Sequence, residues 1–337
     1  MKILVDAFGG DNSPVDVVQG SIEALKENKD FTLGLVGKED EIKKVLSTLT
    51  YDKSRVEIIN ADDVISCEEE PTVAIRRKPN SSICVGLKTL KENDDCDAFI
   101  SAGSTGAFLV GATLKLGRIK GISRPALCPI LPRLDGGKVL LLDAGANADC
   151  KPQNLYEFAL MGSIFCNLAL GVEKPKVYLL SNGTEDKKGN MLTLETFPLL
   201  KECKDINFMG NMEARDLLSS DADVVVADGF AGNVALKSYE GGTKCVLSAL
   251  KKGIKGSLGG IIGALFMKKV FKNLKKQLDY SSQGGALFLG TQKVIIKPHG
   301  SAKAITFKNT VLQAVDVVNS GVLDKIKENF SKINEQE

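Results

Sequence analysis

The sequence predicts an α/β fold with a mostly parallel sheet, and two observations support that class. Strand-like apolar runs alternate with helix-like segments along most of the chain, which is typical of parallel strands joined through covering helices. Three apolar runs, ending near residues 7, 101 and 227, stop at a glycine-rich turn that a helix-like pattern follows at once. These turns should lie at the carboxyl edge of the sheet, where ligands bind in such folds.

Each element is assigned from its pattern. Apolar runs predict strands at 3–7, 32–36, 56–59, 98–101, 139–143, 177–181, 206–209, 223–227 and 294–296. Helical periodicity predicts helices at 14–26, 40–49, 106–116, 154–170 and 302–320. The segment 118–135 is expected to cross between subdomains, and 324–337 to form a polar helix or a frayed end. The whole chain, 1–337, is expected to be a single α/β catalytic unit.

Composition limits the class of protein. The chain has 337 residues, 43% of them hydrophobic, which suffices for a large core and argues against global disorder. A net charge of +2 does not indicate binding to nucleic acid. Eight cysteines without a Cys-x-x-Cys pair indicate buried thiols in a reducing compartment. An early acid, Asp6, argues against a signal peptide, and no apolar stretch reaches the ~18–20 residues that span a bilayer. A cytosolic protein is therefore expected.

The first glycine turn, at 6–14, follows the first predicted strand. Such turns are expected to leave backbone N–H groups unpaired, and these attract anions. Gly9 and Gly10 would let the backbone approach a phosphate, while Asp6 or Asp11 positions a neighbouring group. Ser13 is expected to cap the next helix, with a proline at the first helical position. The alternative is a tight turn without a ligand.

The second turn, at 101–107, places two hydroxyls between two glycines. Gly103, Ser104, Thr105 and Gly106 could form a nest of amides for an anion, to which the hydroxyls would donate further hydrogen bonds. A plain helix cap is the competing interpretation.

The third turn, at 228–233, follows an unusually continuous apolar run. Asp228, Gly229 and Gly232 would line the anion site. Asn233, expected in the first helical turn, would face the site with an amide that both donates and accepts hydrogen bonds. Because asparagine at a helix start is more often a cap, capping is the alternative role for Asn233.

Two further loops follow predicted strands. Asn147, in the turn 143–147, is a candidate for phosphate binding. The charged loop 182–190 contains Lys187 and Lys188, which could reach an anion or could be solvated surface.

The residue types that are scarce narrow the chemistry. His299 is the one histidine in the sequence, so a Ser–His–Asp or Cys–His site could be built only around it. The sequence has no His-x-x-His or comparable metal spacing. The nucleophile is therefore expected to be the substrate itself, positioned by the protein without a metal or cofactor.

Ten segments in order resemble the PlsX family, the phosphate acyltransferases of bacterial phospholipid synthesis. They lie at 6–11, 74–82, 101–107, 117–127, 142–147, 183–190, 210–216, 228–234, 284–286 and 299–301. The resemblance covers nearly the whole chain. Each segment alone is a weak signal, whereas ten in order are specific. Phe8 and Ser104 depart from the family pattern, which usually has Met and Asn there.

The resemblance implies a fold, a reaction and two catalytic residues. The fold would be a three-layer α/β/α, Rossmann-like architecture similar to isopropylmalate dehydrogenase and phosphotransacetylase, in a homodimer. The enzyme would transfer a fatty acyl group from acyl carrier protein to orthophosphate, and the acyl phosphate would feed a membrane glycerol-3-phosphate acyltransferase. Lys188 matches the family's catalytic lysine, and Asn233 matches its active-site asparagine.

Three other functions stay open. A phosphotransacetylase-like enzyme would use acyl-CoA as the donor. A metal- and NAD-dependent decarboxylating dehydrogenase would need clustered carboxylates, for which Asp143 and Asp228 are candidates. A non-catalytic membrane scaffold could retain an anion pocket.

A basic amphipathic segment, 251–278, is expected to contact a membrane or a partner. It contains eight lysines and no acid, which favours an interfacial anchor on anionic lipid. The predicted membrane contacts are Ile254, Leu258, Ile261, Ile262 and Leu265. The lysines could also attract an acidic carrier protein, and a core or dimer-interface helix is the alternative. The protein is thus expected to be cytoplasmic and peripherally membrane-associated.

Overall fold

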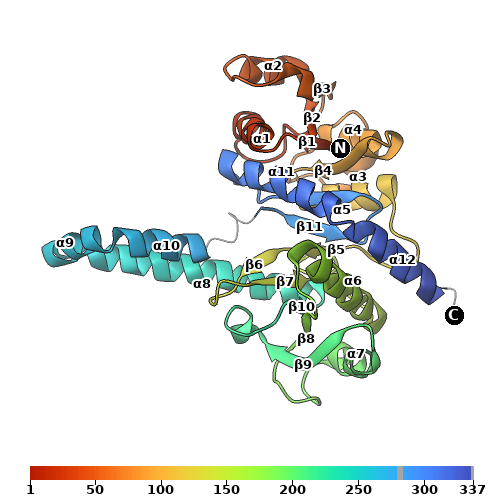
Figure 1. The fold of residues 1–337 in the computed structure, drawn as a ribbon, viewed down its shortest axis with the longest axis vertical. Helices are drawn as coiled ribbons and strands as arrows, with labels where there is room; N and C mark the ends of the chain where they lie inside the picture. The colour runs from red at the N-terminus through yellow and green to blue at the C-terminus, as the bar shows by residue number, and fades with distance from the viewer. Residues whose placement is uncertain (279–283, 335–337) are drawn as a thin grey trace.

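In the computed structural model, which describes residues 1–278 and 284–334, the described strands form two sheets (Figure 1). The first has the order β3-β2-β1-β4-β12-β11-β5, and the second the order β6-β7-β10-β8-β9. The first sheet contains β1 (Lys2–Asp6), β2 (Thr32–Gly37), β3 (Val56–Asn60), β4 (Cys96–Ile100), β5 (Ala126–Cys128), β11 (Ala286–Leu289) and β12 (Val294–Lys297). The second contains β6 (Ile130–Pro132), β7 (Lys138–Leu142), β8 (Lys176–Ser181), β9 (Asn207–Glu213) and β10 (Val224–Val226).

Most neighbouring strands run parallel, as predicted. The exceptions are β11, which is antiparallel to β12 and β5, and the edge strand β6, which is antiparallel to β7. The α/β class and the mostly parallel pairing are confirmed. The division into two sheets is new, because alternation of strands and helices does not reveal which strands pair.

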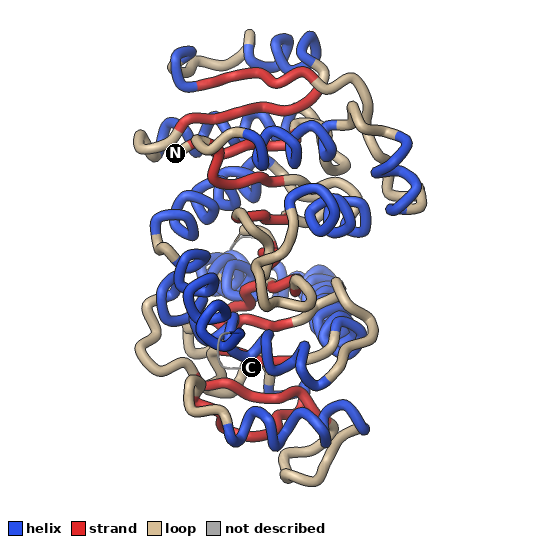
Figure 2. The backbone as a smooth tube through the Cα atoms, turned by 90° about the vertical axis from the view of Figure 1, so that its right-hand side faces the viewer, coloured by secondary structure: helices blue, strands red, loops and turns tan. Residues whose placement is uncertain are grey.

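Helices cover the sheets on both sides (Figure 2). On the first sheet, α1 (Val15–Glu27) and α11 (Ala304–Asn319) contact each other and the strands, and α4 (Ser82–Glu92) contacts β1, β2 and β4. On the second, α6 (Pro152–Leu170) and α7 (Met191–Glu202) pack together, while α8 (Gly229–Lys255) contacts β7. Four further helices are α2 (Glu39–Leu46), α3 (Pro71–Arg77), α5 (Thr105–Gly111) and α12 (Val322–Asn334), with a π-helical turn at Ala112–Leu116 after α5.

One hydrophobic core extends through both sheets. It includes Ile3 and Val5 of β1, Leu140 of β7 and Phe158 of α6, each of them fully buried. Separate clusters fill the opposite face of each sheet. The two sheets are therefore parts of one packed body, although no hydrogen-bonded ladder between described strands joins them.

The segment 118–135 crosses between the sheets, as predicted. It contains β5 of the first sheet and β6 of the second, and Pro129 alone separates them. These two strands and β11 are absent from the strands predicted from the sequence.

The start of α1 differs from the prediction. The helix begins at Val15 after Pro14, and the Ser13 hydroxyl donates to the carbonyl oxygen of Gly10 at 2.8 Å, so Ser13 does not cap the helix. The prediction of buried thiols also holds only in part. Cys67 and Cys245 are exposed, whereas four other cysteines are buried.

The basic segment forms an arm that extends from the body (Figure 1). The chain leaves along α8, turns back at α9 (Leu258–Phe266), which contacts α8, and returns through α10 (Lys268–Leu278). The segment 251–278 thus holds the end of α8 and all of α9 and α10, with breaks at Gly256 and Ser257 and at Met267. Within the described residues, no helix is both long and apolar enough to cross a bilayer.

We predict that Gly20→Ala destabilises the protein. A Cβ atom at Gly20 of α1 would lie 2.1 Å from the Ala304 carbonyl oxygen and 2.8 Å from Phe307 Cβ, both in α11. Overpacking of this kind costs about 1–3 kcal/mol, and the midpoint of urea unfolding measures it.

The matched control is Gly241→Ala on α8, where nothing lies within 4 Å of the added methyl. This change should stabilise the helix by up to about 1 kcal/mol. Equal midpoints for the two variants would contradict the close packing of α1 on α11.

Candidate active site

The turns after β1 and β4 are in direct contact. The Ser101 hydroxyl donates to the buried Asp6 carboxylate at 2.6 Å, and the Phe8 amide donates to it at 3.0 Å. Burial raises the pKa of Asp6. A Cβ atom at Gly9 would lie 2.7 Å from the Gly103 nitrogen, so only glycine permits this approach.

A second group of turns is organised by the buried carboxylate of Asp143. It accepts hydrogen bonds from the amides of Gly145 (3.1 Å), Ala146 (3.0 Å) and Asn147 (2.7 Å), and from Asn147 Nδ2 (2.8 Å). It also accepts from the Leu127 amide at 3.0 Å, and Leu127 belongs to β5 of the other sheet. Burial raises the pKa of Asp143, and the hydrogen bonds oppose that rise.

The prediction of unpaired amides in the glycine turns is wrong for six of the predicted phosphate-binding residues. Their backbone N–H groups have acceptors within the protein. They are Gly9, Asp11, Gly103, Asn147, Gly229 and Gly232. The reason is that the chain's own oxygens, several of them on Asp6, Ser101 and Asp143, lie where an external anion would otherwise accept. Contact of these residues with phosphate stays a prediction.

The other residues of the second turn have separate tasks. The Ser104 hydroxyl caps α5 by accepting from the Ala107 amide at 3.3 Å, which supports the cap interpretation. Thr105 lines a cavity between the two sheets. Two of the predicted glycines lie close to neighbouring segments. A Cβ atom at Gly106, in the second turn, would lie 2.6 Å from Pro71 Cγ, and one at Gly10, in the first turn, would lie 2.9 Å from the Gly300 carbonyl oxygen.

Asp228, not Asn233, caps α8. Its carboxylate accepts from the Ala231 amide at 2.7 Å, and Asn233 lies in the second turn of the helix, one turn beyond the predicted position. The Asn233 side chain is exposed, lines the same cavity as Thr105 and faces Gly145, where an added Cβ would lie 3.5 Å from Asn233 Cγ. Its amide is thus free for a role other than capping.

This cavity, which we call the smaller cavity, has a volume of about 350 Å³ and lies where the two groups of turns meet. The first sheet contributes Lys297 and the residues that follow β12, and the second contributes Ala144 and Gly145. Its polar side chains are Thr105, Asn233, Lys237, Lys297 and His299. The structure therefore brings together residues from several strand ends, as such folds predict.

Lys297 is a component that the sequence interpretation missed. Burial lowers its pKa to about 8, and the positive charge of Lys237 acts in the same direction. The sequence does contain a signal, because Lys297 directly follows the strand predicted at 294–296 and so lies at the ligand-binding edge.

His299 lines the smaller cavity, and its Nδ1 is engaged by Ser301. Its Nδ1 accepts from the Ser301 amide at 3.2 Å and lies 2.8 Å from the Ser301 hydroxyl. A neutral ring therefore carries its proton on Nε2. Burial lowers the pKa of His299, so the neutral form prevails at pH 7.

Lys188 lies outside the lining of the smaller cavity. It is exposed in the loop between β8 and α7, and its aliphatic part covers Gly183. The adjacent residues Gly189 and Asn190 line a different, larger cavity, together with Asp228.

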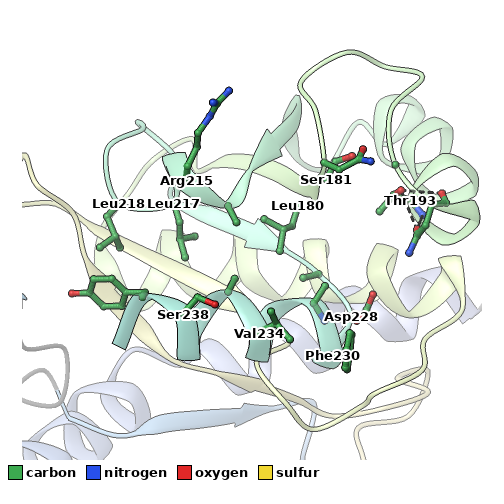
Figure 3. A pocket seen from close by; sticks show the side chains of 18 of the residues that line it. Leu180, Ser181, Thr193, Arg215, Leu217, Leu218, Asp228, Phe230, Val234 and Ser238 are labelled. Atoms are coloured by element: carbon green, nitrogen blue, oxygen red, sulfur yellow. Dashed lines mark hydrogen bonds between the residues drawn. The ribbon is translucent and has the colours of Figure 1, made fainter. Parts of the chain in front are cut away.

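The larger cavity, about 900 Å³, is mainly apolar (Figure 3). Leu180, Leu217 and Leu218 lie on one side, and Phe230 and Val234 of α8 on the other. Helix α8 separates the two cavities, since Asn233 and its neighbours one turn on line the smaller one. The described residues contain no group of three or more His, Cys, Asp or Glu side chains arranged for a metal.

Comparison with known proteins places this geometry in context. The chain matches the family described as "Fatty acid synthesis protein" over residues 1–325. It is 46% identical over 332 residues to a phosphate acyltransferase of Clostridium perfringens (strain SM101), covering 98% of this chain and 97% of that one. It is 48% identical over 332 residues to a phosphate acyltransferase of Clostridium novyi, covering 98% and 99%. A solved phosphotransacetylase from Streptococcus pyogenes has the same fold, with a TM-score of 0.59, 16% identity and coverage of 95% and 94%.

We predict that Asp143→Ala strongly destabilises the protein. The substitution would leave four backbone amides and one side-chain amide without their acceptor. Because an unpaired buried donor costs about 1–3 kcal/mol, the free energy of unfolding should fall by at least about 3 kcal/mol. Urea unfolding measures the change.

Two variants serve as controls. Asp143→Asn keeps one acceptor oxygen and should be intermediate, whereas Asp149→Ala, at an exposed position in the same loop, should change stability by less than about 0.5 kcal/mol. An Asp143→Ala protein as stable as Asp149→Ala would contradict the organising role of this carboxylate.

Proposed function

The chain belongs to the fatty acid synthesis protein family and is an enzyme that transfers an acyl group to phosphate, and we propose that its donor is a long-chain acyl group on acyl carrier protein. The product, an acyl phosphate, would serve phospholipid synthesis through a membrane glycerol-3-phosphate acyltransferase. The observation that carries the proposal is the pair of cavities on the two sides of α8. One is small and polar with cationic side chains, and the other is large and apolar.

The chemistry needs little from the protein beyond positioning and charge. An oxygen of the hydrogen phosphate dianion attacks the thioester carbonyl carbon, forming a C–O bond. The C–S bond breaks, and its electron pair leaves with sulfur. The proton that the phosphate carried ends on that sulfur, so the products are an acyl phosphate dianion and a free thiol. Holding the two reactants in attack geometry can lower the barrier by about 7–11 kcal/mol.

Asn233 and Lys188 have complementary proposed roles. The Asn233 amide, which is not used as a helix cap, would donate to the oxyanion that develops on the thioester carbonyl. Lys188 would neutralise the charge that accumulates when this oxyanion forms beside a phosphate. Its loop borders the larger cavity at the N-terminal end of α8, the same end that carries Asn233.

The larger cavity supports a long acyl group over an acetyl group. Its lining of leucine, phenylalanine and valine side chains would bury methylene groups, each worth about 0.8 kcal/mol. An acyl-CoA donor, as in a phosphotransacetylase, is the alternative. The two differ in the carrier and not in the bond that breaks, so an assay must compare them directly.

The testing experiment incubates the purified protein with inorganic phosphate and one of three donors. These are palmitoyl-acyl carrier protein, palmitoyl-CoA and acetyl-CoA. Hydroxylamine traps the acyl phosphate, and thiol release is measured in parallel. Phosphate-dependent product with the carrier-bound donor at the highest kcat/KM is expected. A preference for acetyl-CoA would reject the proposed donor, and absence of phosphate-dependent thiol release would reject acyl transfer to phosphate.

We also propose that the arm places the enzyme on an anionic membrane, which would make it a cytoplasmic, peripherally associated protein. Of the predicted contacts, Leu258, Ile261, Ile262 and Leu265 are exposed on α9, whereas Ile254 lies in the last turn of α8 and is partly buried. Phe266, which the prediction omitted, is 87% exposed.

The charge on the arm fits this surface. Exposed lysines at 251, 252, 255, 268, 269 and 272 flank the apolar turn, and such clusters are attracted to anionic lipid at about 1 kcal/mol per residue. A second copy of the chain is the competing occupant, since the proposed enzyme is a homodimer.

We predict that Lys188→Ala and Asn233→Ala fold normally and lose turnover. Both side chains are exposed, so stability should change little. Loss of one donor to a developing oxyanion typically costs about 2.7–4 kcal/mol, or about 10²–10³-fold in kcat. The neighbouring Lys187→Ala is the matched control for position 188 and should retain its rate. A purified Lys188→Ala enzyme with the rate of Lys187→Ala would remove Lys188 from the mechanism.

We predict that replacing Leu258, Leu265 and Phe266 by serine abolishes binding to vesicles of anionic phospholipid. Co-sedimentation at low salt measures binding, and thiol release with soluble carrier should persist. The control replaces Leu114 and Leu168, which are exposed on the body, by serine. If the arm variant still binds vesicles, or becomes monomeric without any change in vesicle binding, the lipid assignment fails.

A further inference from the structure

Two lysines, Lys237 and Lys297, line the smaller cavity, and Lys297 is the one without a described carboxylate at ion-pair distance. It ends β12, and its Nζ donates to the carbonyl oxygens of Ala102 at 3.4 Å and Pro298 at 3.3 Å. Both hydrogen bonds are longer than the usual 2.7–3.2 Å. Among the residues that the structure describes, no carboxylate lies within the 4.0 Å of an ion pair with this ammonium.

Other lysines near the site differ in this respect. Lys237, which also lines the smaller cavity, pairs with Glu240 at 2.9 Å. Lys78, at the end of α3, which packs on α5, pairs with Glu69 at 2.9 Å. A partly buried ammonium normally has such a partner, because removing a charge from water is costly unless the charge is paired. The Lys297 ammonium is partly removed from water and contacts only carbonyl oxygens, which is expected when its charged partner is a ligand.

We infer that the Lys297 ammonium is the phosphate-binding cation of this enzyme, and that the smaller cavity is the site of inorganic phosphate. This inference rests on the proposed function. The Thr105 hydroxyl and the Asn233 amide line the same cavity and can donate to the other phosphate oxygens. Six of the predicted phosphate-binding residues already have their backbone amides paired within the protein, so a side-chain cation would supply much of the attraction.

The charges around Lys297 set the pH range of binding. The ammonium interacts with Asp6 at the end of β1, with Asp11 in the turn that follows, and with Cys67 in the loop before α3. It also interacts with Lys237 of α8 and with the adjacent His299. With burial dominating, the pKa of Lys297 is about 8. The side chain is therefore cationic below about pH 8, and phosphate binding should weaken as pH rises through that value, whereas bound phosphate should raise the pKa.

The experiment measures phosphate binding and turnover in four proteins. They are the wild type, Lys297→Met, Lys297→Arg and the control Lys293→Met. Lys293 immediately precedes β12, at the opposite end from Lys297, and its Nζ donates to the Cys96 carbonyl oxygen. Binding of inorganic phosphate is measured without donor by ³¹P line broadening. Thiol release gives KM for phosphate and KM for the acyl donor, and circular dichroism confirms that each variant is folded.

Loss of a charge-assisted hydrogen bond should weaken phosphate binding in Lys297→Met by about 10- to 100-fold. KM for the donor should stay within about twofold. Lys297→Arg should restore part of the affinity. The wild-type kcat/KM for phosphate should fall above about pH 8, and this decline should be absent in Lys297→Arg, whose guanidinium stays protonated.

Three results would overturn the inference. They are an unchanged phosphate affinity in Lys297→Met, an equal rise in both KM values, and an alkaline decline that persists in Lys297→Arg. A Lys297→Met protein that fails to fold leaves the arginine variant and its pH profile to decide. Failure of the proposed function looks different, since the wild type itself would then neither broaden the phosphate signal nor release thiol.

Discussion

The Asp143 carboxylate is the interaction on which the relation between the two sheets depends. It follows β7 and accepts hydrogen bonds from three consecutive amides of its own turn and from the Asn147 side chain. Its fifth donor is the amide of Leu127, which belongs to the other sheet. The return bond runs from the Ala144 amide to the Leu127 oxygen at 2.9 Å. Since no described ladder connects the sheets, this exchange aligns the two edges that enclose the smaller cavity.

Helix α8 connects the parts of the molecule that the proposed function uses. Asp228 caps its first turn. Gly232 lets that turn lie against the backbone of Asp143, since a Cβ atom at position 232 would be 1.9 Å from the Asp143 carbonyl oxygen. One side of the helix then carries Asn233 toward the polar cavity, and another carries Phe230 and Val234 toward the apolar one. A displacement of this helix would change both cavities at once, so the proposed catalytic and acyl-binding sites share one structural element.

The sequence predicts the class of fold, most strands and the strand ends at which the cavities lie, because these follow from local periodicity and glycine placement. It does not predict the pairing of strands into two sheets, which depends on contacts between distant segments. It also suggests free amides where Asp6 and Asp143 in fact accept them, since an aspartate after a strand looks the same whether it faces a ligand or its own turn. The inference about Lys297 needs the three-dimensional structure, because it depends on there being no described carboxylate within ion-pair distance of its ammonium.

The continuity of α8 from the cavities to the arm sets a length scale. Asn233 and Lys255 lie in one uninterrupted helix, so at about 1.5 Å per residue they are separated by roughly 33 Å along its axis. If, as proposed, the apolar turn of α9 rests on lipid, this stiff helix limits how far Asn233 can lie from the headgroups. An acyl phosphate formed beside Asn233 would then be released close to the bilayer that receives it.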